Sequence, residues 1–247
     1  MPEINECFES LYVSPQDLDA LFERGWRHFG SLFYRYESAR HDDAEYRVMP
    51  VRVDLEKFSL SKSQRRTLRR NEDLEFRHAD ATIDKEKEDL FANHRRRFKH
   101  SRPDSIYDFL SPLPALYPCR TLELTARSNG RLVATSFYDR AEKSLSAVYA
   151  MFDLAESRRR LGVATALMEI ARAMELGKRR YYLGYAYWGE SFYDYKKQFA
   201  GLEYYNWRGT WAPYDPSLEP APRTRARTER APAKSASRAD AREAGNM

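Results

Sequence analysis

The order of strands and helices predicted between residues 121 and 199 constrains the fold of this chain more than any other feature. Asn129-Gly130 lies between two predicted strands, and this dipeptide is a strong signal for a tight β-hairpin. Apolar residues at helical spacing then predict a helix over 158–176, which Gly177 ends. The predicted strands are 121–127, 131–139, 144–153 and 179–185. We therefore expect an α/β (α+β) fold, in which helices flank a mixed, mainly antiparallel sheet.

The composition is that of a folded protein. The chain has 247 residues, 42% of them hydrophobic, which is enough for a sizeable core in one large domain or two small ones. Its two cysteines, Cys7 and Cys119, provide neither a disulfide framework nor the four ligands of a structural zinc site. The sequence shows no apolar leader segment and no run of about eighteen apolar residues. We expect a soluble cytoplasmic protein in a reducing compartment, with no metal, no cofactor and no membrane contact.

The first part of the chain predicts a smaller N-terminal α/β region. Ser14 and Pro15 are typical of the start of a helix, and Gly25 is typical of its end. Aromatic and β-branched residues then predict two strands, and a polar run between them predicts an exposed loop. The strands are expected at 26–36 and 46–55, and the loop at 37–45.

A strongly basic helix is predicted after residue 61. Ser61 and Gln64 match a capping box, which starts a helix. Five cations then follow the i, i+3, i+4, i+7, i+8 spacing and share one helical face without an interleaved Asp or Glu. Either this face is simply solvated, or it binds a polyphosphate, of which RNA is the most obvious form. The candidate RNA-binding residues are Lys62, Ser63, Arg65, Arg66, Arg69 and Arg70.

The remaining segments suggest how the chain is divided. Residues 84–100 predict a helix, and the Pro-containing stretch 102–118 predicts a loop at a domain seam. After about Glu219 the chain lacks aromatic and branched aliphatic residues and is expected to be disordered. The expected units are an N-terminal arm (1–10), the α/β region with the basic helix (11–80), a helix and connecting loop (81–118), the sheet-and-helix domain (119–212) and an Arg/Ala/Pro-rich tail (213–247).

The entry to the helix over 158–176 resembles a known anion-binding turn. Arg159, Gly162 and Ala164 match the Arg/Gln-x-x-Gly-x-Gly/Ala turn of the GCN5-related N-acetyltransferase (GNAT) fold. In that fold the turn presents backbone N–H groups and the helix N-terminus to a pyrophosphate. The order of elements also resembles this fold. The resemblance implies a GNAT-like domain over 119–212 and an acyl-CoA-dependent N-acetyltransferase as one functional hypothesis.

A second resemblance covers roughly residues 11–205. Its motifs are Glu23-Arg-Gly-Trp-Arg27, Phe58 with Ser61-Lys-Ser-Gln-Arg-Arg66 and Arg69-Arg-Asn71, Gly130-Arg-Leu, Val148-Tyr149 with Asp153, Glu175-Leu-Gly177, Tyr182-Leu-Gly-Tyr185 and Tyr195-Lys196. In this combination the chain resembles the aminoacyl-tRNA–protein transferases of the N-degron pathway, which are arginyltransferases and bacterial leucyltransferases. The resemblance implies transfer of Arg or Leu from a charged tRNA to the N-terminus of an acceptor protein, usually one beginning with Asp or Glu. The basic helix then becomes a tRNA phosphate contact.

The reaction that this resemblance implies is aminolysis of an activated ester. A neutral α-amine attacks the aminoacyl carbonyl, charge builds on the carbonyl oxygen, and the ribose hydroxyl leaves. Orientation and donors aimed at that oxygen suffice, without a strong acid–base pair. Our candidate catalytic residues are Tyr149, Tyr185 and Lys196 as donors, with Asp153 accepting a proton, holding the amine or ordering the strand end. The alternatives are that the tyrosines pack in the core and that Lys196 pairs with Asp194 or solvent.

The chain departs from this family at its cysteines. Family members commonly carry an N-terminal Cys-rich motif and a second Cys cluster between the first two strands, whereas the corresponding loop 37–45 has no cysteine. A Cys-x-x-Met element before the Tyr-Lys pair is replaced by Glu190-Ser-Phe-Tyr193. Metal binding is therefore not expected, and the donated amino acid and the acceptor N-terminus stay open. A third hypothesis is a diverged protein that binds tRNA or an N-degron without catalysis.

Overall fold

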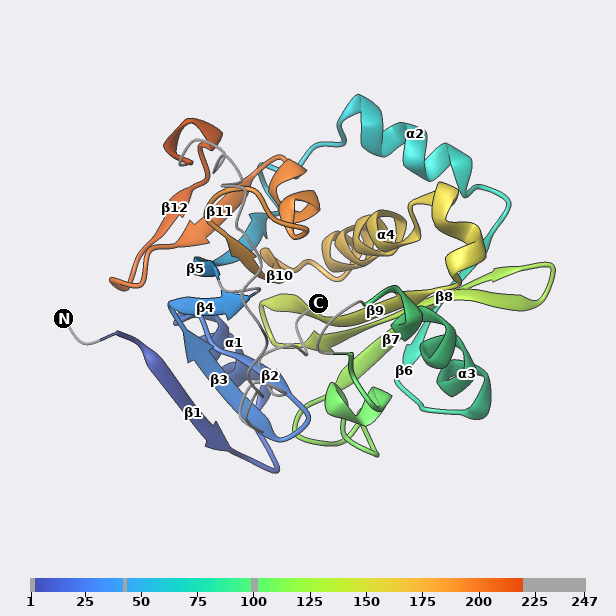
Figure 1. Ribbon diagram of the computed structural model, residues 1–247, viewed down its shortest axis with the longest axis horizontal. Coiled ribbons are helices and arrows are strands. Elements are labelled where there is room, and N and C mark those ends of the chain that lie inside the picture. Colours follow the sequence, from blue (N-terminus) through green and yellow to red (C-terminus); the bar gives the residue numbers. More distant parts are fainter. Residues whose placement is uncertain (1–2, 42–43, 99–101, 220–247) are drawn as a thin grey trace, which may run out of the picture.

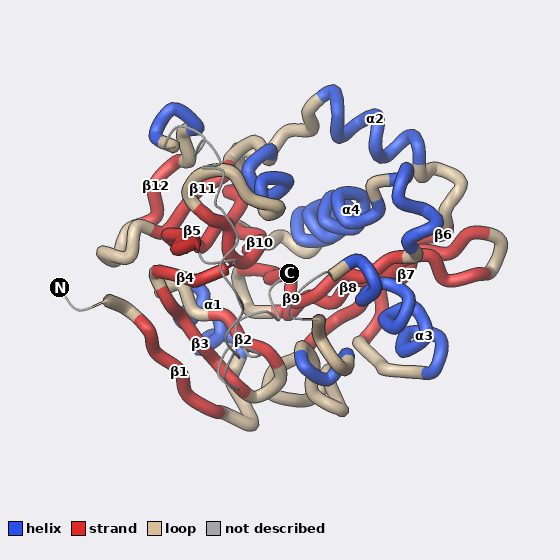
Figure 2. The backbone as a smooth tube through the Cα atoms, viewed as in Figure 1, coloured by secondary structure: helices blue, strands red, loops and turns tan. Residues whose placement is uncertain are grey.

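The strands form two sheets in the computed structural model, which describes residues 3–41, 44–98 and 102–219 (Figure 1, Figure 2). The small sheet has the order β1-β3-β2, with β1 at Asn5–Glu9, β2 at Arg27–Phe29 and β3 at Leu32–Tyr36. The large sheet has nine strands in the order β12-β11-β5-β10-β9-β8-β7-β6, and β4 also pairs with β5. Its strands are β4 (Ser38–His41), β5 (Ala44–Asp54), β6 (Glu75–Asp80), β7 (Thr121–Ser128), β8 (Arg131–Arg140), β9 (Ser144–Phe152), β10 (Arg180–Tyr187), β11 (Leu202–Tyr205) and β12 (Trp211–Pro213).

Helices cover both faces of the large sheet. Helix α4 (Leu161–Glu175) packs on one face through residues such as Leu167 and Ile170. Helix α3 (Lys85–His94) and the segment that carries Phe109 cover β8 and β9 on the other face. Helix α1 (Pro15–Glu23) packs against the small sheet, and α2 (Lys62–Arg70) lies outside α4 (Figure 1). No helix in the described part of the chain is long and apolar enough to cross a membrane.

The structure confirms the predicted fold class and several local signals. β7 and β8 form an antiparallel hairpin around Asn129-Gly130, both of which have positive φ. Ser14 caps α1, and Ser61 and Gln64 form the predicted capping box of α2. The predicted order of hairpin, strand, helix and strand is the order of β7, β8, β9, α4 and β10. α4 connects β9 to β10, which are the one parallel pair among the neighbouring described strands of this sheet.

Several predicted boundaries are wrong. The single strand expected at 26–36 is the hairpin β2–β3, because Gly30, with a φ of 50°, turns the chain. The loop expected at 37–45 contains β4, whose polar residues are tolerated because it pairs on one side only, with β5. The helix expected at 84–100 ends as an α-helix at His94 and continues as a 3-10 turn. The helix expected from residue 158 begins at Leu161, because Arg160 takes a left-handed conformation there.

The large sheet takes strands from both sides of the predicted boundaries at residues 80 and 118. β5 pairs with β10 and β11, and β6, which was not predicted, pairs with β7. Sharing a sheet does not determine which segments fold together, so the five predicted units stay a prediction. Of the predicted tail, residues 220–247 lie outside the described residues.

Candidate active site

β9 and β10 separate soon after they pair, and this separation creates the site. They pair only where Arg180–Tyr182 faces Ser144–Ser146. Just beyond, the β8–β9 register shifts between Phe137 and Tyr138, and the β10–β5 register shifts between Tyr182 and Gly184. Each shift leaves one extra residue, Val148 in β9 and Leu183 in β10. Extra residues of this kind bend a strand, so the two strands diverge toward their C-terminal ends.

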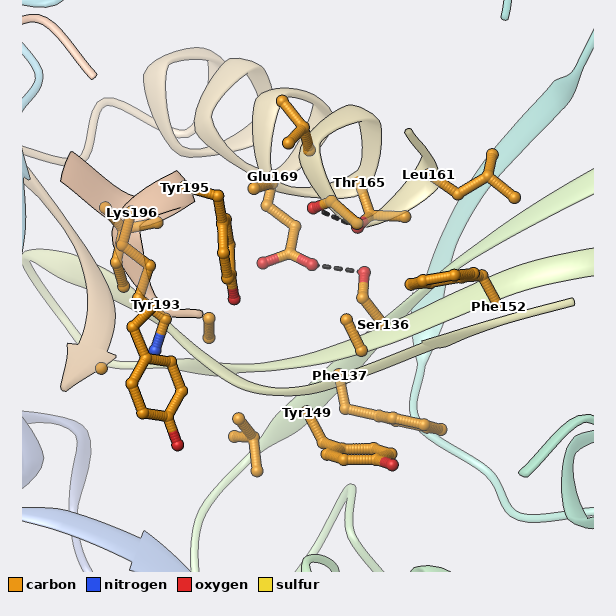
Figure 3. A pocket seen from close by; sticks show the side chains of 18 of the residues that line it. Ser136, Phe137, Tyr149, Phe152, Leu161, Thr165, Glu169, Tyr193, Tyr195 and Lys196 are labelled. Atoms are coloured by element: carbon orange, nitrogen blue, oxygen red, sulfur yellow. Dashed lines mark hydrogen bonds between the residues drawn. The ribbon is translucent and has the colours of Figure 1, made fainter. Parts of the chain in front are cut away.

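A cavity of about 370 Å³ occupies the space between the diverging strands and α4 (Figure 3). Aromatic rings supply much of its wall, among them Tyr149, Phe152 and Tyr193. Four cationic side chains and one carboxylate also line it, and none of the four cations forms an ion pair with a carboxylate of the described residues. The cations are Arg27, Arg97, Arg160 and Lys196, and the carboxylate is Glu169. Such a cavity suits a ligand with electron-rich oxygen atoms.

Lys196 is the predicted catalytic residue that the structure places most directly in the cavity. It belongs to a 3-10 turn at Asp194–Gln198, and its Nζ donates to the carbonyl oxygen of Tyr185 at 2.7 Å. The ammonium also lies 4.7 Å from the centre of the Tyr193 ring. Burial, and then the charge of Arg27, lower the pKa of Lys196 to about 7. This amine can therefore exist in either protonation state near neutral pH.

Gly184 makes room for this lysine. A Cβ at Gly184 would lie 3.3 Å from Lys196 Nζ, and the residue has a φ of +90°. Gly184→Ala is therefore expected to lower the free energy of unfolding by about 1–3 kcal/mol, through backbone strain plus the displacement of Lys196. Denaturant titration measures this effect. Gly209→Ala is the matched control, because Gly209 has a φ of +87° but nothing within 4 Å of a new Cβ. Equal losses in both variants would contradict the close contact with Lys196.

The side chain of Arg27 lies where β9 and β10 separate. From the sequence, Arg27 was named only as part of a motif, and no role was predicted for it. Its guanidinium is buried and donates to Ser146 Oγ and to the carbonyl oxygen of Ala147. These are the β9 groups that lie where pairing with β10 ends. Arg27 thus holds the gap open with a fixed positive charge beside Lys196. The signal that could have identified Arg27 was its place in the motif Glu23-Arg-Gly-Trp-Arg27.

Two tyrosine hydroxyls in the cavity wall have no hydrogen-bond partner among the described residues. They belong to Tyr149, which was predicted, and to Tyr193, which was not among the candidate catalytic residues. Both side chains are more than nine-tenths buried, and burial keeps each phenol protonated by raising its pKa. Tyr149 is held by the Phe109 ring, which stacks on it with ring centres 3.9 Å apart. Buried donors without a partner are costly, so both hydroxyls are suited to an acceptor atom of a ligand.

Glu169 is the carboxylate of the cavity, and the sequence prediction missed it. It lies on the sheet-facing side of α4, and 2% of its surface is exposed. Its carboxylate accepts hydrogen bonds from Ser136 Oγ and, at 2.5 Å, from the Tyr181 hydroxyl. Burial raises the pKa of Glu169 to about 7. The available signal was a charged residue directly between two apolar residues of the predicted helix, Met168 and Ile170.

The other predicted catalytic groups lie outside the cavity lining. Asp153 accepts hydrogen bonds from Arg131 and from the backbone N–H of Ala155. The Tyr185 hydroxyl donates to the carbonyl oxygen of Gly25 at 2.8 Å, so it is the backbone of Tyr185, and not its phenol, that meets Lys196. Tyr149 and Lys196 are therefore brought together at one cavity, whereas Asp153 and the Tyr185 phenol have partners elsewhere.

The predicted pyrophosphate turn opens into the same cavity. Gly162 lines it, but Arg159 forms ion pairs with Asp73 at 2.7 Å and with Glu156 at 2.8 Å. Ala164 is buried in α4. Arg160, the neighbour of Arg159, lines the cavity instead.

The predicted basic face of α2 is exposed and lies next to this turn. Its five cations are Lys62, Arg65, Arg66, Arg69 and Arg70, and none of them forms an ion pair with a carboxylate of the described residues. Arg70 donates to the carbonyl oxygen of Arg158 at 2.6 Å. Arg160 donates to Ser63 Oγ at 2.9 Å. Through Arg160 the basic face is continuous with the cavity.

A buried group of three potential metal ligands lies elsewhere, between the two sheets. The ligand atoms of His28, Cys119 and Asp139 lie within 4.8 Å of one another. His28 Nε2 contacts Asp139 at 2.8 Å and His28 Nδ1 contacts the carbonyl oxygen of Gly30 at 3.0 Å. Both ring nitrogens of His28 therefore lie at hydrogen-bond distance from oxygen atoms of the protein, and these contacts hold the ring between the two sheets.

Named relatives show how much of the chain has known counterparts. Proteins called aspartate/glutamate leucyltransferase include one from Leptospira interrogans, 30% identical over 194 residues, which are 75% of this chain and 72% of that protein. The one from Gluconacetobacter diazotrophicus is 32% identical over 172 residues, or 68% of this chain and 65% of that protein. The one from Rhizobium etli is 38% identical over 97 residues, so the match spans only 37% of that relative.

Solved structures and a family profile complete the comparison. L-PGS from Bacillus licheniformis has a TM-score of 0.47 at 15% identity, covering 75% of this chain and 55% of that chain. FemX has a TM-score of 0.47 at 10% identity, and the match covers 75% of this chain and 66% of the FemX chain. These likenesses concern the general fold alone. The profile described as "Arginine-tRNA-protein transferase, C terminus" matches residues 29–206. This chain therefore belongs to the arginine-tRNA–protein transferase family.

Proposed function

We propose that this chain transfers an amino acid from an aminoacyl-tRNA to the N-terminal amine of an acceptor protein. The observation that carries the proposal is the position of Lys196 in the gap between β9 and β10, in a cavity that is continuous with the basic face of α2. A tRNA bound along α2 would direct its aminoacylated end past Arg160 toward Lys196. The cytoplasm, where charged tRNA is available, is the proposed place of action.

The chemistry asks little of the protein beyond orientation and electrostatic stabilisation. The acceptor nitrogen attacks the ester carbonyl and forms the amide bond, while the bond between the carbonyl carbon and the ribose oxygen breaks. The proton that the nitrogen loses passes to the ribose oxygen, which leaves as a hydroxyl. Lys196 is proposed to donate to the oxygen on which charge develops, in the fixed positive field of Arg27. The hydroxyls of Tyr149 and Tyr193 are proposed to hold other oxygen atoms of the substrates.

The proposed substrates follow the relatives' names and the charge of the cavity. The donor is proposed to carry Leu or Arg, and the acceptor to begin with Asp or Glu. An acidic acceptor side chain suits a cavity that is lined by four cationic side chains, none of which has a carboxylate partner among the described residues. Asp153 and Tyr185 stay in the proposal only as residues that order the strand ends around the site.

Incubation of the purified protein with charged tRNA tests this proposal. Labelled leucyl-tRNA, labelled arginyl-tRNA and labelled acetyl-CoA would each be offered with peptides that begin with Asp, Glu, Lys or Arg. We expect label to pass from a charged tRNA to the Asp and Glu peptides. Transfer from acetyl-CoA alone would support the acyl-CoA hypothesis. Binding of tRNA without any transfer would support a non-catalytic protein.

A further inference from the structure

Glu169 stands out because it is a carboxylate inside a positively charged cavity. The cavity lining contains four cationic side chains, and Glu169 is the single carboxylate among the described residues that line it. Its side chain is buried on the sheet-facing side of α4, rather than on the exposed side where glutamates usually lie. No step of the proposed reaction uses it.

The contacts of Glu169 leave room for a ligand. A carboxylate has about four acceptor positions, and Ser136 and the Tyr181 hydroxyl occupy one on each oxygen. Figure 3 shows the carboxylate directed into the cavity, between the Tyr195 ring and Ser136. Burial raises the pKa of Glu169 to about 7. A cation bound next to the carboxylate would favour its ionised form. The free positions therefore face the space that a donor would occupy.

We propose that Glu169 binds the α-ammonium group of the aminoacyl residue on the donor tRNA. This inference rests on the proposed function, which brings an aminoacyl ester into the cavity. Such an ester carries its ammonium beside the reacting carbonyl, so a cation must enter a cavity that already holds Arg27, Arg97, Arg160 and Lys196. Glu169 offsets that repulsion, while Lys196 faces the carbonyl oxygen. Glu169 takes no proton from either substrate and acts by binding and orienting the donor.

A purely structural role for Glu169 makes a different prediction. Its hydrogen bonds to Ser136 of β8 and Tyr181 of β10 also tie α4 to the sheet. If that were its whole role, its replacement would affect all donors equally. If Glu169 binds the ammonium, the replacement affects only donors that carry an α-amine. The two roles can therefore be separated by comparing, within each protein variant, a donor that carries an α-amine with a donor that carries a hydroxyl in its place.

The experiment compares two donors in the full-length protein. One is tRNA charged with leucine, and the other is the same tRNA charged with 2-hydroxy-4-methylpentanoic acid, in which a hydroxyl replaces the α-amine. We expect the wild type to prefer the leucyl donor in kcat/KM by about 10- to 100-fold, and Glu169→Gln to abolish most of that preference. Because the ratio is taken within one protein, a general loss of stability or tRNA affinity cancels. An unchanged ratio in Glu169→Gln, or no preference in the wild type, would overturn the proposal.

Two controls make the result specific. Glu175→Gln changes an exposed glutamate of the same helix, which pairs with Arg172 at 3.0 Å, and should keep the wild-type preference. Arginyl-tRNA tests whether Glu169 holds a side-chain guanidinium instead. In that case Glu169→Gln would lower arginine transfer selectively and leave the preference for amine over hydroxyl unchanged, which would overturn the α-ammonium assignment.

A binding measurement separates this inference from the proposed function. The probe is leucine joined through an amide to 3′-amino-3′-deoxyadenosine, with the 4-methylpentanoyl conjugate as its counterpart without the amine. If the wild type transfers nothing, the proposed function fails, but calorimetric titration with these stable conjugates still reports on Glu169. At least tenfold tighter binding of the amine form, lost in Glu169→Gln, would support the site. Equal binding of both conjugates, or binding of neither, would overturn it.

Discussion

Replacing Lys196 with methionine is expected to lower the rate constant of amino-acid transfer about 10²- to 10³-fold, which is the usual cost of removing one donor to a developing oxyanion. Methionine has a similar length but no proton to donate. The measurement is single-turnover transfer from a labelled aminoacyl-tRNA to an acceptor peptide. Lys143→Met is the matched control, because Lys143 is exposed in the turn between β8 and β9. A comparable loss in the control, or full activity in Lys196→Met, would remove Lys196 from the proposed mechanism.

The pH dependence of transfer distinguishes a lysine that donates from one that acts as a base. The acceptor α-amine must be neutral, and its pKa is about 7.7–8.0, so the rate rises with pH as that amine loses its proton. Lys196 must keep its proton in order to donate, and its pKa is about 7. The rate is therefore expected to pass through a maximum and to fall on the alkaline side. Lys196→Arg, which stays charged, should lack the alkaline fall. A wild-type rate that only rises to a plateau would contradict the role of Lys196 as a proton donor.

The free energy of unfolding of Lys196→Met shows whether a loss of activity in this variant reflects a loss of folding. The pKa of Lys196 falls from an ordinary 10.5 to about 7 in the folded protein, so the unfolded chain binds the proton more tightly. The contribution of Lys196 to the free energy of unfolding therefore rises as the pH increases from about 7 to 10.5, and it is least favourable below pH 7. Methionine removes the buried amine next to Arg27. Lys196→Met should thus be at least as stable as the wild type at about pH 7, as measured by denaturant titration.

Local signals predicted those parts of the molecule that a short segment determines by itself. Asn129-Gly130 placed the hairpin because its positive φ values suit a tight turn, and Ser61 with Gln64 placed the start of α2 because their capping hydrogen bonds are local. The Tyr195-Lys196 pair came from the resemblance rather than from the physics of the segment. The structure then placed Lys196, but not the phenol of Tyr185, at the cavity.

The site itself could not be predicted because its geometry is not local. The gap depends on one extra residue in each of β9 and β10, and each extra residue is defined only by the pairing of its strand with another neighbour. Arg27 reaches Ser146 across 119 positions of the sequence. Glu169 was missed for a related reason, since helical periodicity assigns charged residues to the exposed side, and only the hydroxyls of Ser136 and Tyr181 make its burial tolerable.

Reversing two charges on α2 is expected to weaken tRNA binding by about 100-fold at low ionic strength, because two phosphate contacts are replaced by repulsion. Arg66→Glu with Arg69→Glu is the informative variant. Both side chains are exposed, and neither donates a hydrogen bond to another described residue. Arg65 and Arg70 are left in place because they bond the carbonyl oxygens of Leu60 and Arg158. Binding is measured by titration of labelled tRNA over a series of salt concentrations.

The salt dependence decides whether the lost affinity came from phosphate contacts. Losing two contacts should reduce the slope of log K against log[salt] by about 1.8 for a double-helical acceptor stem. The matched control is Lys143→Glu with Arg208→Glu, which makes the same change in net charge at exposed positions away from α2. If affinity fell equally in the two variants, the effect would come from net charge and not from the basic face. If affinity and slope both stayed at the wild-type values, α2 would be a solvated surface, and the path of the tRNA toward Lys196 would have to follow another face of the molecule.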